Sequence, residues 1–242
     1  MRRRIARALQ AWGACSWEGF SRSLYDPGAQ RVLTRALTVT LSLFWRNGAV
    51  FRYLQQVVLP EIMRGLGPGE PLIAWSAGTA SGQEAYSLAM AASGLPEEQE
   101  EHRPVYIIGS DLDAPALRRS SGEEWTRGEL KEIPPDLRDR FFSDSGGTTA
   151  LDPLQRRKVI LIQANLWESP PLRYAHLVLC RNAIMTYFHG APREEAMERI
   201  VSLLSPGGWL VLGRKEHLPK RWAARWGLVH AGRRIYRRGA GG

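Results

Sequence analysis

The stretch Trp75-Ser-Ala-Gly-Thr-Ala-Ser-Gly-Gln-Glu84 joins a short apolar run, residues 71–75, to a segment with amphipathic helical spacing, residues 84–92. Gly78 and Gly82 within it lack a Cβ, so the backbone can turn there and approach a ligand closely. A short buried strand, a glycine-bearing turn and a helix are typical of a parallel α/β sheet. The spacing is neither that of a dinucleotide fingerprint nor that of a P-loop, so no phosphate cradle is predicted.

Further along the chain, four more short apolar runs predict buried strands: 105–109, 159–162, 176–180 and 208–212, with a helix starting at residue 115. Continuous apolar strands that alternate with helices indicate a mainly parallel sheet covered on both faces. Residues 226–230 and 233–237 flank Ala231-Gly232 and predict an antiparallel terminal hairpin. The expected fold class is therefore α/β, a Rossmann-like doubly wound sheet with an antiparallel hairpin at its end.

Residues 1–65 have helical spacing of apolar residues, and Leu66-Gly-Pro-Gly69 is typical of a linker. We therefore expect an all-α cap over residues 1–65 and a sheet domain over residues 70–242. The segment 143–157 is rich in Ser, Gly and Thr and does not fit the strand–helix alternation. It is interpreted as a surface loop or a small insertion.

The composition of the 242 residues, 44% hydrophobic and 24% charged, is that of an ordinary globular protein. No apolar run approaches the roughly 20 residues of a membrane span, and the N-terminal arginines precede no signal-peptide core. With only Cys15 and Cys180, the chain suits a reducing compartment, and we expect a cytoplasmic location. The net charge of +9 fits nucleic acid, an acidic protein, anionic lipid or an arginine-rich genome, so charge alone names no partner.

Asp111 and Asp113 follow the second predicted strand. In a doubly wound sheet, an acid at that point can accept hydrogen bonds from ribose hydroxyls. The alternative is that one or both carboxylates cap the next helix.

Five segments in order resemble signatures of the chemotaxis-receptor methyltransferase (CheR) family. Residues 75–90 resemble W-S-A-x-x-x-x-G-E-E-P-Y-S-x-A-M, and residues 43–46, Leu-Phe-Trp-Arg, are similar to F-F-R. Residues 110–113 resemble S-D-I-D, Asn165-Leu166 resembles the N-L pair, and Cys180-Arg-Asn182 with Thr186-Tyr-Phe188 resembles C-R-N-x-x-I-Y-F. Each piece is weak alone, but their ordered combination from about residue 29 to 218 is specific.

The resemblance implies a class I S-adenosylmethionine-dependent methyltransferase that forms glutamate methyl esters and releases S-adenosylhomocysteine. It places Asp111 at the ribose, Asn165 and Leu166 along the adenine, and Arg46 and Tyr187, the expected catalytic residues, at the transferring methyl group. The positions that it implies for cofactor binding are Thr40, Ser42, Arg46, Ala77, Gly78, Gly82, Glu84, Asp111, Leu112, Asn165, Leu166, Arg181 and Asn182. No metal site is expected.

The same resemblance implies the partner, an acidic protein helix of a chemoreceptor in chemotaxis-type signal transduction, with no nucleic acid and no membrane insertion. The alternatives are a non-catalytic S-adenosylmethionine-binding scaffold, or a methyltransferase for another protein or a small molecule. A nucleic-acid methyltransferase is disfavoured because Ser169-Pro-Pro171 precedes the fourth strand instead of following it. The oligomeric state is left open.

Gln83, Ala85 and Trp45 depart from the family pattern, where Glu, Pro and Phe stand. Relatives that tether to a receptor's C-terminal peptide carry a small β-subdomain after the second helix. The stretch 143–157 looks too poor in residues that favour strands to assert such docking, so whether it forms a docking subdomain is left open.

Overall fold

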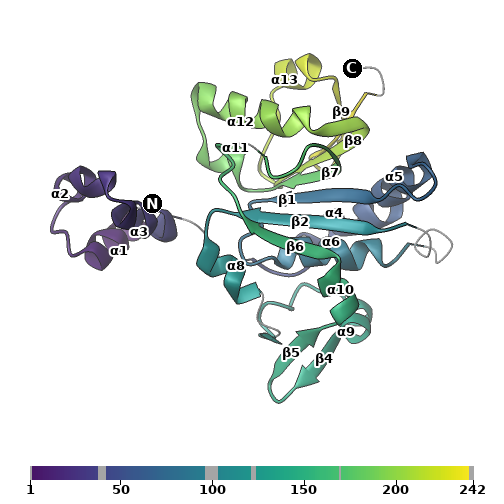
Figure 1. Ribbon diagram of the computed structural model, residues 1–242, viewed down its shortest axis with the longest axis horizontal. Coiled ribbons are helices and arrows are strands. Elements are labelled where there is room, and N and C mark those ends of the chain that lie inside the picture. The colour runs from purple at the N-terminus through teal and green to yellow at the C-terminus, as the bar shows by residue number, and fades with distance from the viewer. Residues whose placement is uncertain (1, 38–41, 96–102, 121–123, 169, 240–242) are drawn as a thin grey trace. The chain divides into compact units, whose positions relative to one another are not determined.

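The computed structural model describes residues 2–37, 42–95, 103–120, 124–168 and 170–239. The chain forms two compact units, Met1–Leu41 and Ser42–Gly242 (Figure 1). The smaller unit contains α1 (Arg2–Trp12), α2 (Trp17–Arg22), the 3-10 helix η1 (Ser23–Tyr25) and α3 (Pro27–Leu37). Its small core is built around Ala8, Phe20 and Ala29, which are buried.

The larger unit holds the remaining elements. Its helices are α4 (Gly48–Tyr53), the π-helix η2 (Leu54–Val58), α5 (Leu59–Gly65), α6 (Gln83–Ala92), α8 (Ala114–Ser120), α9 (Pro135–Phe141), α10 (Pro153–Arg157), α11 (Ile184–Tyr187), α12 (Gly190–Ser202) and α13 (Lys220–Arg225). Its strands are β1 (Leu72–Ala77), β2 (Val105–Asp111), β3 (Glu124–Trp125), β4 (Phe142–Ser145), β5 (Thr148–Leu151), β6 (Val159–Gln163), β7 (Ala175–Cys180), β8 (Leu204–Leu212), β9 (Leu228–Gly232) and β10 (Ile235–Arg238).

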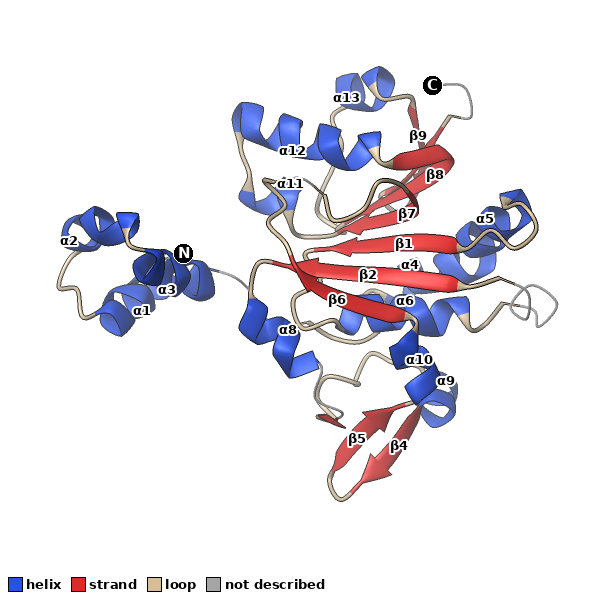
Figure 2. Ribbon diagram, viewed as in Figure 1, coloured by secondary structure: helices blue, strands red, loops and turns tan. Residues whose placement is uncertain are grey.

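Seven strands form one sheet in the order β6-β2-β1-β7-β8-β10-β9 (Figure 2). The first five of these run parallel, whereas β10 is antiparallel to both β8 and β9. The predicted doubly wound sheet with an antiparallel terminal hairpin is confirmed. The chain passes from β1 to β2 on one side and returns to β7 on the other, so the strand order reverses at β1. In doubly wound sheets, ligands bind in the crevice at the carboxyl ends of the strands beside such a reversal.

Alternating side chains of the central strands bury opposite faces of the sheet. On β7, Leu177 and Leu179 face the core beneath α4, η2, α5 and α6, whereas Val178 and Cys180 face the core beneath α12 and α13. This alternation has the period of two that a strand imposes. The helices α8 and α11, which follow β2 and β7, both lie beyond the carboxyl ends of the parallel strands (Figure 1).

The predicted cap of residues 1–65 spans the division between the two units. The segments α4, η2 and α5 belong to the larger unit, where Phe51, Leu54 and Leu59 join the core of the sheet. Helical spacing shows that a segment has an apolar face, but not which surface that face covers. The compact boundary therefore falls after Leu41, not in the linker that follows residue 65.

The segment 143–157 is an ordered insertion. Strands β3, β5 and β4 form a second, antiparallel sheet, in which β4 and β5 make a hairpin that turns at Gly146 and Gly147. The expectation of too little strand-forming sequence for a β-subdomain is wrong, because Trp125, Phe141 and Phe142 supply its apolar contacts from outside the segment.

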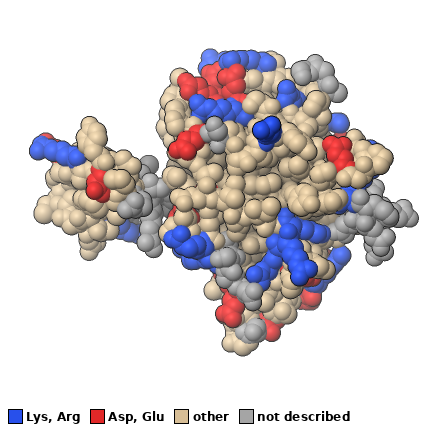
Figure 3. Space-filling model, in the orientation of Figure 1, with Lys and Arg blue, Asp and Glu red and all other residues tan. Residues whose placement is uncertain are grey.

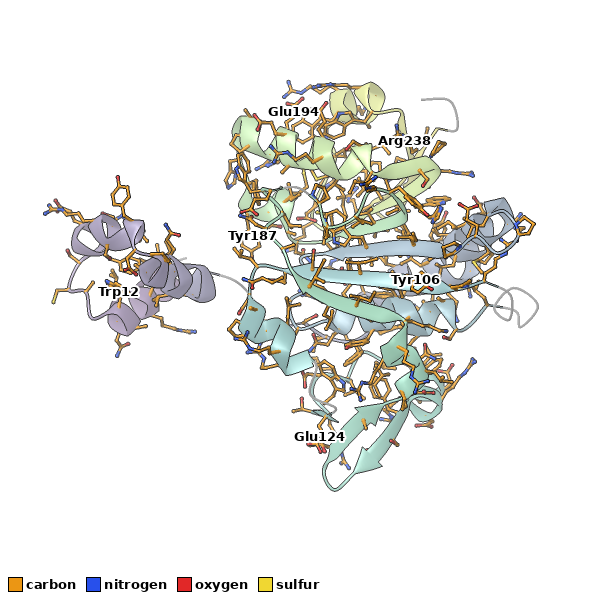
Figure 4. The ribbon with its side chains drawn as sticks, in the orientation of Figure 1. Trp12, Tyr106, Glu124, Tyr187, Glu194 and Arg238 are labelled. Carbon is orange, nitrogen blue, oxygen red and sulfur yellow. The ribbon has the colours of Figure 1, made fainter. Side chains whose placement is uncertain are left out.

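One face of the outer strands β2 and β6 is open to solvent. Tyr106 is 45% exposed and Ile160 is 51% exposed, and the viewed surface over these strands is largely uncharged (Figures 3 and 4). The described part of the connection between β6 and β7 contains no helix that could cover them. None of the described helices is both long enough and apolar enough to cross a membrane.

Helix α6 carries much of the main core, and Leu88 on it is fully buried. We expect Leu88→Ala to lower the free energy of unfolding by about 2–5 kcal/mol, through lost burial and a residual cavity. The matched control Leu154→Ala, at a position 61% exposed on α10, should change it by less than about 0.5 kcal/mol. Urea unfolding followed by circular dichroism measures both, and equal losses would contradict this account of the core.

Candidate active site

The turn after β1 is held against β2 by its backbone. The N–H groups of Gly78 and Thr79 donate to the carbonyl oxygen of Ser110 at 2.8 and 2.9 Å, just beyond Ala77 at the end of β1. Gly78 has φ +82°, and a Cβ there would lie 2.9 Å from the Cβ of Ala183. Gly82, with φ +81°, caps α6. Glycine is therefore required at Gly78 both by backbone conformation and by space.

Asp111 closes the same turn from the end of β2. Its carboxylate accepts hydrogen bonds from the N–H groups of Ala80 at 2.7 Å and Asp113 at 3.0 Å. Burial raises the pKa of the Asp111 carboxyl, and the two backbone donors oppose that shift. Asp113 instead accepts from the Ala116 N–H and caps α8, so only one of the two carboxylates is a helix cap. The Asp111 oxygens retain lone pairs for further donors.

Glu84 and Arg181 form a largely buried ion pair across the crevice. Arg181 Nη1 lies 2.9 Å from Glu84 Oε2, and the side chains are 2% and 14% exposed. Ser76 donates to the other Glu84 oxygen at 2.8 Å. Burial raises the pKa of the Glu84 carboxyl, while the neighbouring Arg181 charge and these hydrogen bonds lower it.

Arg181 also reaches the segment before α4. Its Nη2 donates to the carbonyl oxygen of Arg46 at 2.9 Å, and its guanidinium lies 5.6 Å from the ring centroid of Phe51. Arg46 is exposed, and its positive charge lowers the pKa of the Glu84 carboxyl. Ser42 is half-buried, and Thr40 lies outside the described residues.

The loop after β6 lies beside the first turn. Leu166 is half-buried, and its Cδ1 would lie 3.9 Å from a Cβ at Gly78. Asn165 uses its side chain within its own loop, accepting from the Trp167 N–H and donating to Glu168. Leu112 is 46% exposed beyond β2. The structure thus brings Leu166 to the glycine turn, while the Asn165 side chain bonds within the loop.

Glu216, a buried carboxylate outside the predicted site residues, organises the loop after β7. It accepts hydrogen bonds from the N–H groups of Asn182 and Gly213 at 2.9 and 2.7 Å and from the Thr186 hydroxyl at 2.6 Å. Asn182 adopts a left-handed backbone with φ 55°. In the sequence, residues 213–216 resemble the family's G-H-S-E segment only in Gly213 and Glu216, and this resemblance does not reveal which donors Glu216 binds.

Tyr187 ends α11 at the edge of the sheet where the loops after β1, β2 and β7 meet (Figure 4). The residue is 46% exposed. The loop that Glu216 fixes leads directly into this short helix.

The three departures from the family pattern each have local contacts in the structure. Gln83 donates through Nε2 to a carboxylate oxygen of Glu129 at 2.8 Å, where a glutamate would bring two carboxylates together. Ala85 packs where α6 approaches β2, since a Cβ at Gly109 would lie 3.2 Å from its own. Trp45 is buried and stacks on Phe51 with ring centroids 5.1 Å apart.

The donor and acceptor set suits S-adenosylmethionine. Arg181 Nε is buried and has no hydrogen-bond partner in the part of the chain that the structure describes, so a donor remains for an anionic group. Asp111 and Glu84 offer acceptors suited to hydroxyl and ammonium groups, and Leu166 offers an apolar surface. Among the described residues no group of three His, Cys, Asp or Glu side chains could hold a metal ion.

Cys180 immediately precedes Arg181 and is fully buried, and burial raises the pKa of its thiol to about 12. At pH 8 the reactive thiolate is then only about one part in ten thousand of this cysteine. We expect a disulfide reagent such as dithionitrobenzoate to titrate one thiol of the folded protein, the exposed Cys15, and two after denaturation. Rapid titration of both thiols in the native protein would contradict the burial of Cys180.

Gly78→Ala should weaken binding of S-adenosylhomocysteine by about tenfold, because the clash with Ala183 displaces the turn. Gly146→Ala is the matched control, since Gly146 also has a positive φ but no atom within 4 Å of a Cβ. Both variants place alanine in a left-handed backbone conformation, which costs roughly 1–2 kcal/mol. Only Gly78→Ala should lower the affinity for S-adenosylhomocysteine measured by titration calorimetry. Equal affinities for the two variants would exclude a close approach at Gly78.

Comparison with known proteins identifies the family. Residues 40–228 match the family model described as CheR methyltransferase, SAM binding domain. The chain is 33% identical over 196 residues to chemotaxis protein methyltransferase 1 of Pseudomonas aeruginosa, covering 79% of this chain and 71% of that protein. Chemotaxis protein methyltransferase 2 of the same organism is 30% identical over 223 residues, covering 88% of this chain and 76% of the relative.

A third relative is much longer than this chain. An uncharacterized 104.1 kDa protein of Rhodobacter capsulatus is 28% identical over 186 residues, which cover 77% of this chain but 19% of that protein. Among solved structures, an O-methyltransferase family protein from Burkholderia thailandensis matches with a TM-score of 0.47 and 12% identity, covering 92% of this chain and 62% of that one. The chain belongs to the CheR methyltransferase family, and its larger unit is a class I methyltransferase fold that binds S-adenosylmethionine.

Proposed function

We propose that the protein methylates glutamate carboxylates of a chemoreceptor-like protein in chemotaxis-type signalling. The observation that carries the proposal is the double engagement of Arg181, which binds Glu84 in the crevice and the carbonyl oxygen of Arg46 at the same time. This contact ties the segment of the expected catalytic arginine to the cofactor site. The expected catalytic Tyr187 lies at the same edge of the sheet (Figure 4).

Methyl transfer to a carboxylate requires no proton transfer by the protein. S-adenosylmethionine supplies a methyl group on a sulfonium centre. A glutamate side chain with an ordinary pKa of about 4.3 is already an anionic nucleophile at neutral pH, so no general base is needed. Arg46 would orient the incoming carboxylate through its guanidinium, and the Tyr187 hydroxyl would donate a hydrogen bond beside it. Positioning and partial loss of water then account for the rate increase.

The charge distribution supports an acidic protein partner. Residues 1–65 contain ten arginines and three acidic residues, a net charge of +7 out of the +9 of the whole chain. The C-terminal arginines are balanced by acidic residues elsewhere in the sheet domain. A basic N-terminal region complements a helix that presents glutamates and speeds its encounter with the enzyme at low salt.

The names of the relatives support the proposed pathway and location. Two proteins about 30% identical to this chain bear the name chemotaxis protein methyltransferase. We infer the same class of substrate here, the cytoplasmic helix of a receptor, and therefore a cytoplasmic site of action. The departures at Gln83 and Trp45 fall where the structure gives them local partners, which is compatible with an intact crevice.

The decisive assay supplies the purified protein with S-adenosylmethionine tritiated in its methyl group and with a receptor cytoplasmic domain. We expect base-labile label on glutamates, released as methanol. Arg46→Ala should lower kcat by on the order of a hundredfold through lost positioning, with Arg46→Lys intermediate because it keeps the charge but not the planar fork. Tyr187→Phe, which removes one hydrogen bond, should lower kcat about tenfold.

Calorimetric binding of S-adenosylhomocysteine provides the control, because Tyr187→Phe should leave it nearly unchanged. A receptor domain whose glutamates are replaced by alanine should accept no label. Base-stable label, or label in RNA, would overturn the glutamate assignment. Absence of label with every receptor domain, despite normal S-adenosylhomocysteine binding, would favour a non-catalytic role.

A further inference from the structure

Two aromatic side chains join loops that lie far apart in the sequence. The rings of Trp167 and Phe188 are stacked, with centroids 5.9 Å apart and planes inclined by 17°. Trp167 directly follows Leu166 on the loop after β6, and Phe188 directly follows Tyr187 at the end of α11. The stack therefore connects the loop beside the glycine turn with the turn that carries the expected catalytic tyrosine.

Helix α12 also contacts Trp167, through Arg199. The guanidinium of Arg199 lies 5.3 Å from the centroid of the Trp167 ring, and Arg199 Nη1 donates to the Trp167 carbonyl oxygen. The backbone N–H of Trp167 donates to the Asn165 side chain. Both the ring and the backbone of this half-exposed residue are thus fixed.

The other end of the stack is equally well held. The Phe188 N–H donates to the carbonyl oxygen of Ile184, and the Phe188 carbonyl oxygen accepts from Arg193 Nε. Because Phe188 adjoins Tyr187 in the chain, a shift of Phe188 would move the tyrosine, which is itself 46% exposed. Stacking of this kind fixes both distance and plane.

We propose that Trp167 is a positioning residue, which through Phe188 sets the place of Tyr187 and through its own backbone sets the loop of Asn165 and Leu166. This role rests on the proposed function only where it concerns Tyr187. A tryptophan 40% exposed contributes less to the core than a buried one, so its contacts serve the geometry of the two loops more than the stability of the fold.

The test compares Trp167→Ala with Trp167→Phe, which keeps an aromatic ring, and with Tyr106→Ala, which removes an aromatic side chain of similar exposure from β2. Trp167→Ala should weaken S-adenosylhomocysteine binding and lower kcat, each by about tenfold, with little change in the thermal midpoint. Trp167→Phe should stay within about twofold of the original protein, and Tyr106→Ala should equal it.

A double-mutant cycle gives the readout that a purely structural role would not produce. Phe188→Ala and Trp167→Ala break the same stack, so the double variant should lose no more kcat than the worse single variant. Arg199→Gln, on the surface of α12, covers the case in which Trp167→Ala fails to fold, and it should weaken S-adenosylhomocysteine binding by a few fold.

The proposal is overturned if the losses of kcat in the two single variants add in the double variant. It is also overturned if folded Trp167→Ala keeps its S-adenosylhomocysteine affinity and kcat, or if Tyr106→Ala loses as much of both. The S-adenosylhomocysteine measurements require no methyl acceptor. If the original protein methylates no glutamate but Trp167→Ala binds S-adenosylhomocysteine less tightly, the proposed function fails while the placement of the Asn165 loop by Trp167 stands.

Discussion

The ion pair of Glu84 with Arg181 is the contact on which the geometry of the crevice depends. Taking two charges largely out of water is costly, and the pair is tolerable only because each member has further hydrogen bonds. Ser76 binds the carboxylate, and the carbonyl oxygen of Arg46 receives the second guanidinium nitrogen. Loss of either partner would leave a charge buried without compensation, so three segments separated by as many as 135 residues are held to one arrangement.

The order of the strands makes this pair possible. Glu84 lies at the start of α6 beyond β1, and Arg181 lies immediately beyond β7, the parallel neighbour of β1. Because β1 and β7 are parallel, their carboxyl ends lie side by side, and opposite charges placed just after these two strands can meet at the crevice. Asp111 and Glu216 act in a similar way on either side, because each accepts one backbone N–H from its own loop and one from another loop, that of Ala80 for Asp111 and that of Asn182 for Glu216.

Residue patterns predicted the seven-stranded sheet well, since buried parallel strands are short, continuous and apolar. They did not find Glu216 or the stacking of Trp167 on Phe188, because those contacts depend on how loops far apart in sequence pack together. The boundary after Leu41 and the small sheet of β3, β4 and β5 were missed for a related reason. In both cases an apolar contact crosses the predicted boundary: Phe51, inside 1–65, packs in the core of the sheet domain, and Trp125, outside 143–157, packs with the small sheet.

The position of β10 in the sheet affects the order in which the strands can pair during folding. It lies between β8 and β9, although it is synthesised after both. During translation β9 therefore has no neighbour in the sheet until Ile235–Arg238 has emerged, and the edge of β8 stays open for the same time. Unpaired strand edges invite wrong pairing, so the sheet is most prone to misassociate just before this short segment is added. The seven-stranded sheet is therefore complete only after β10 has been made.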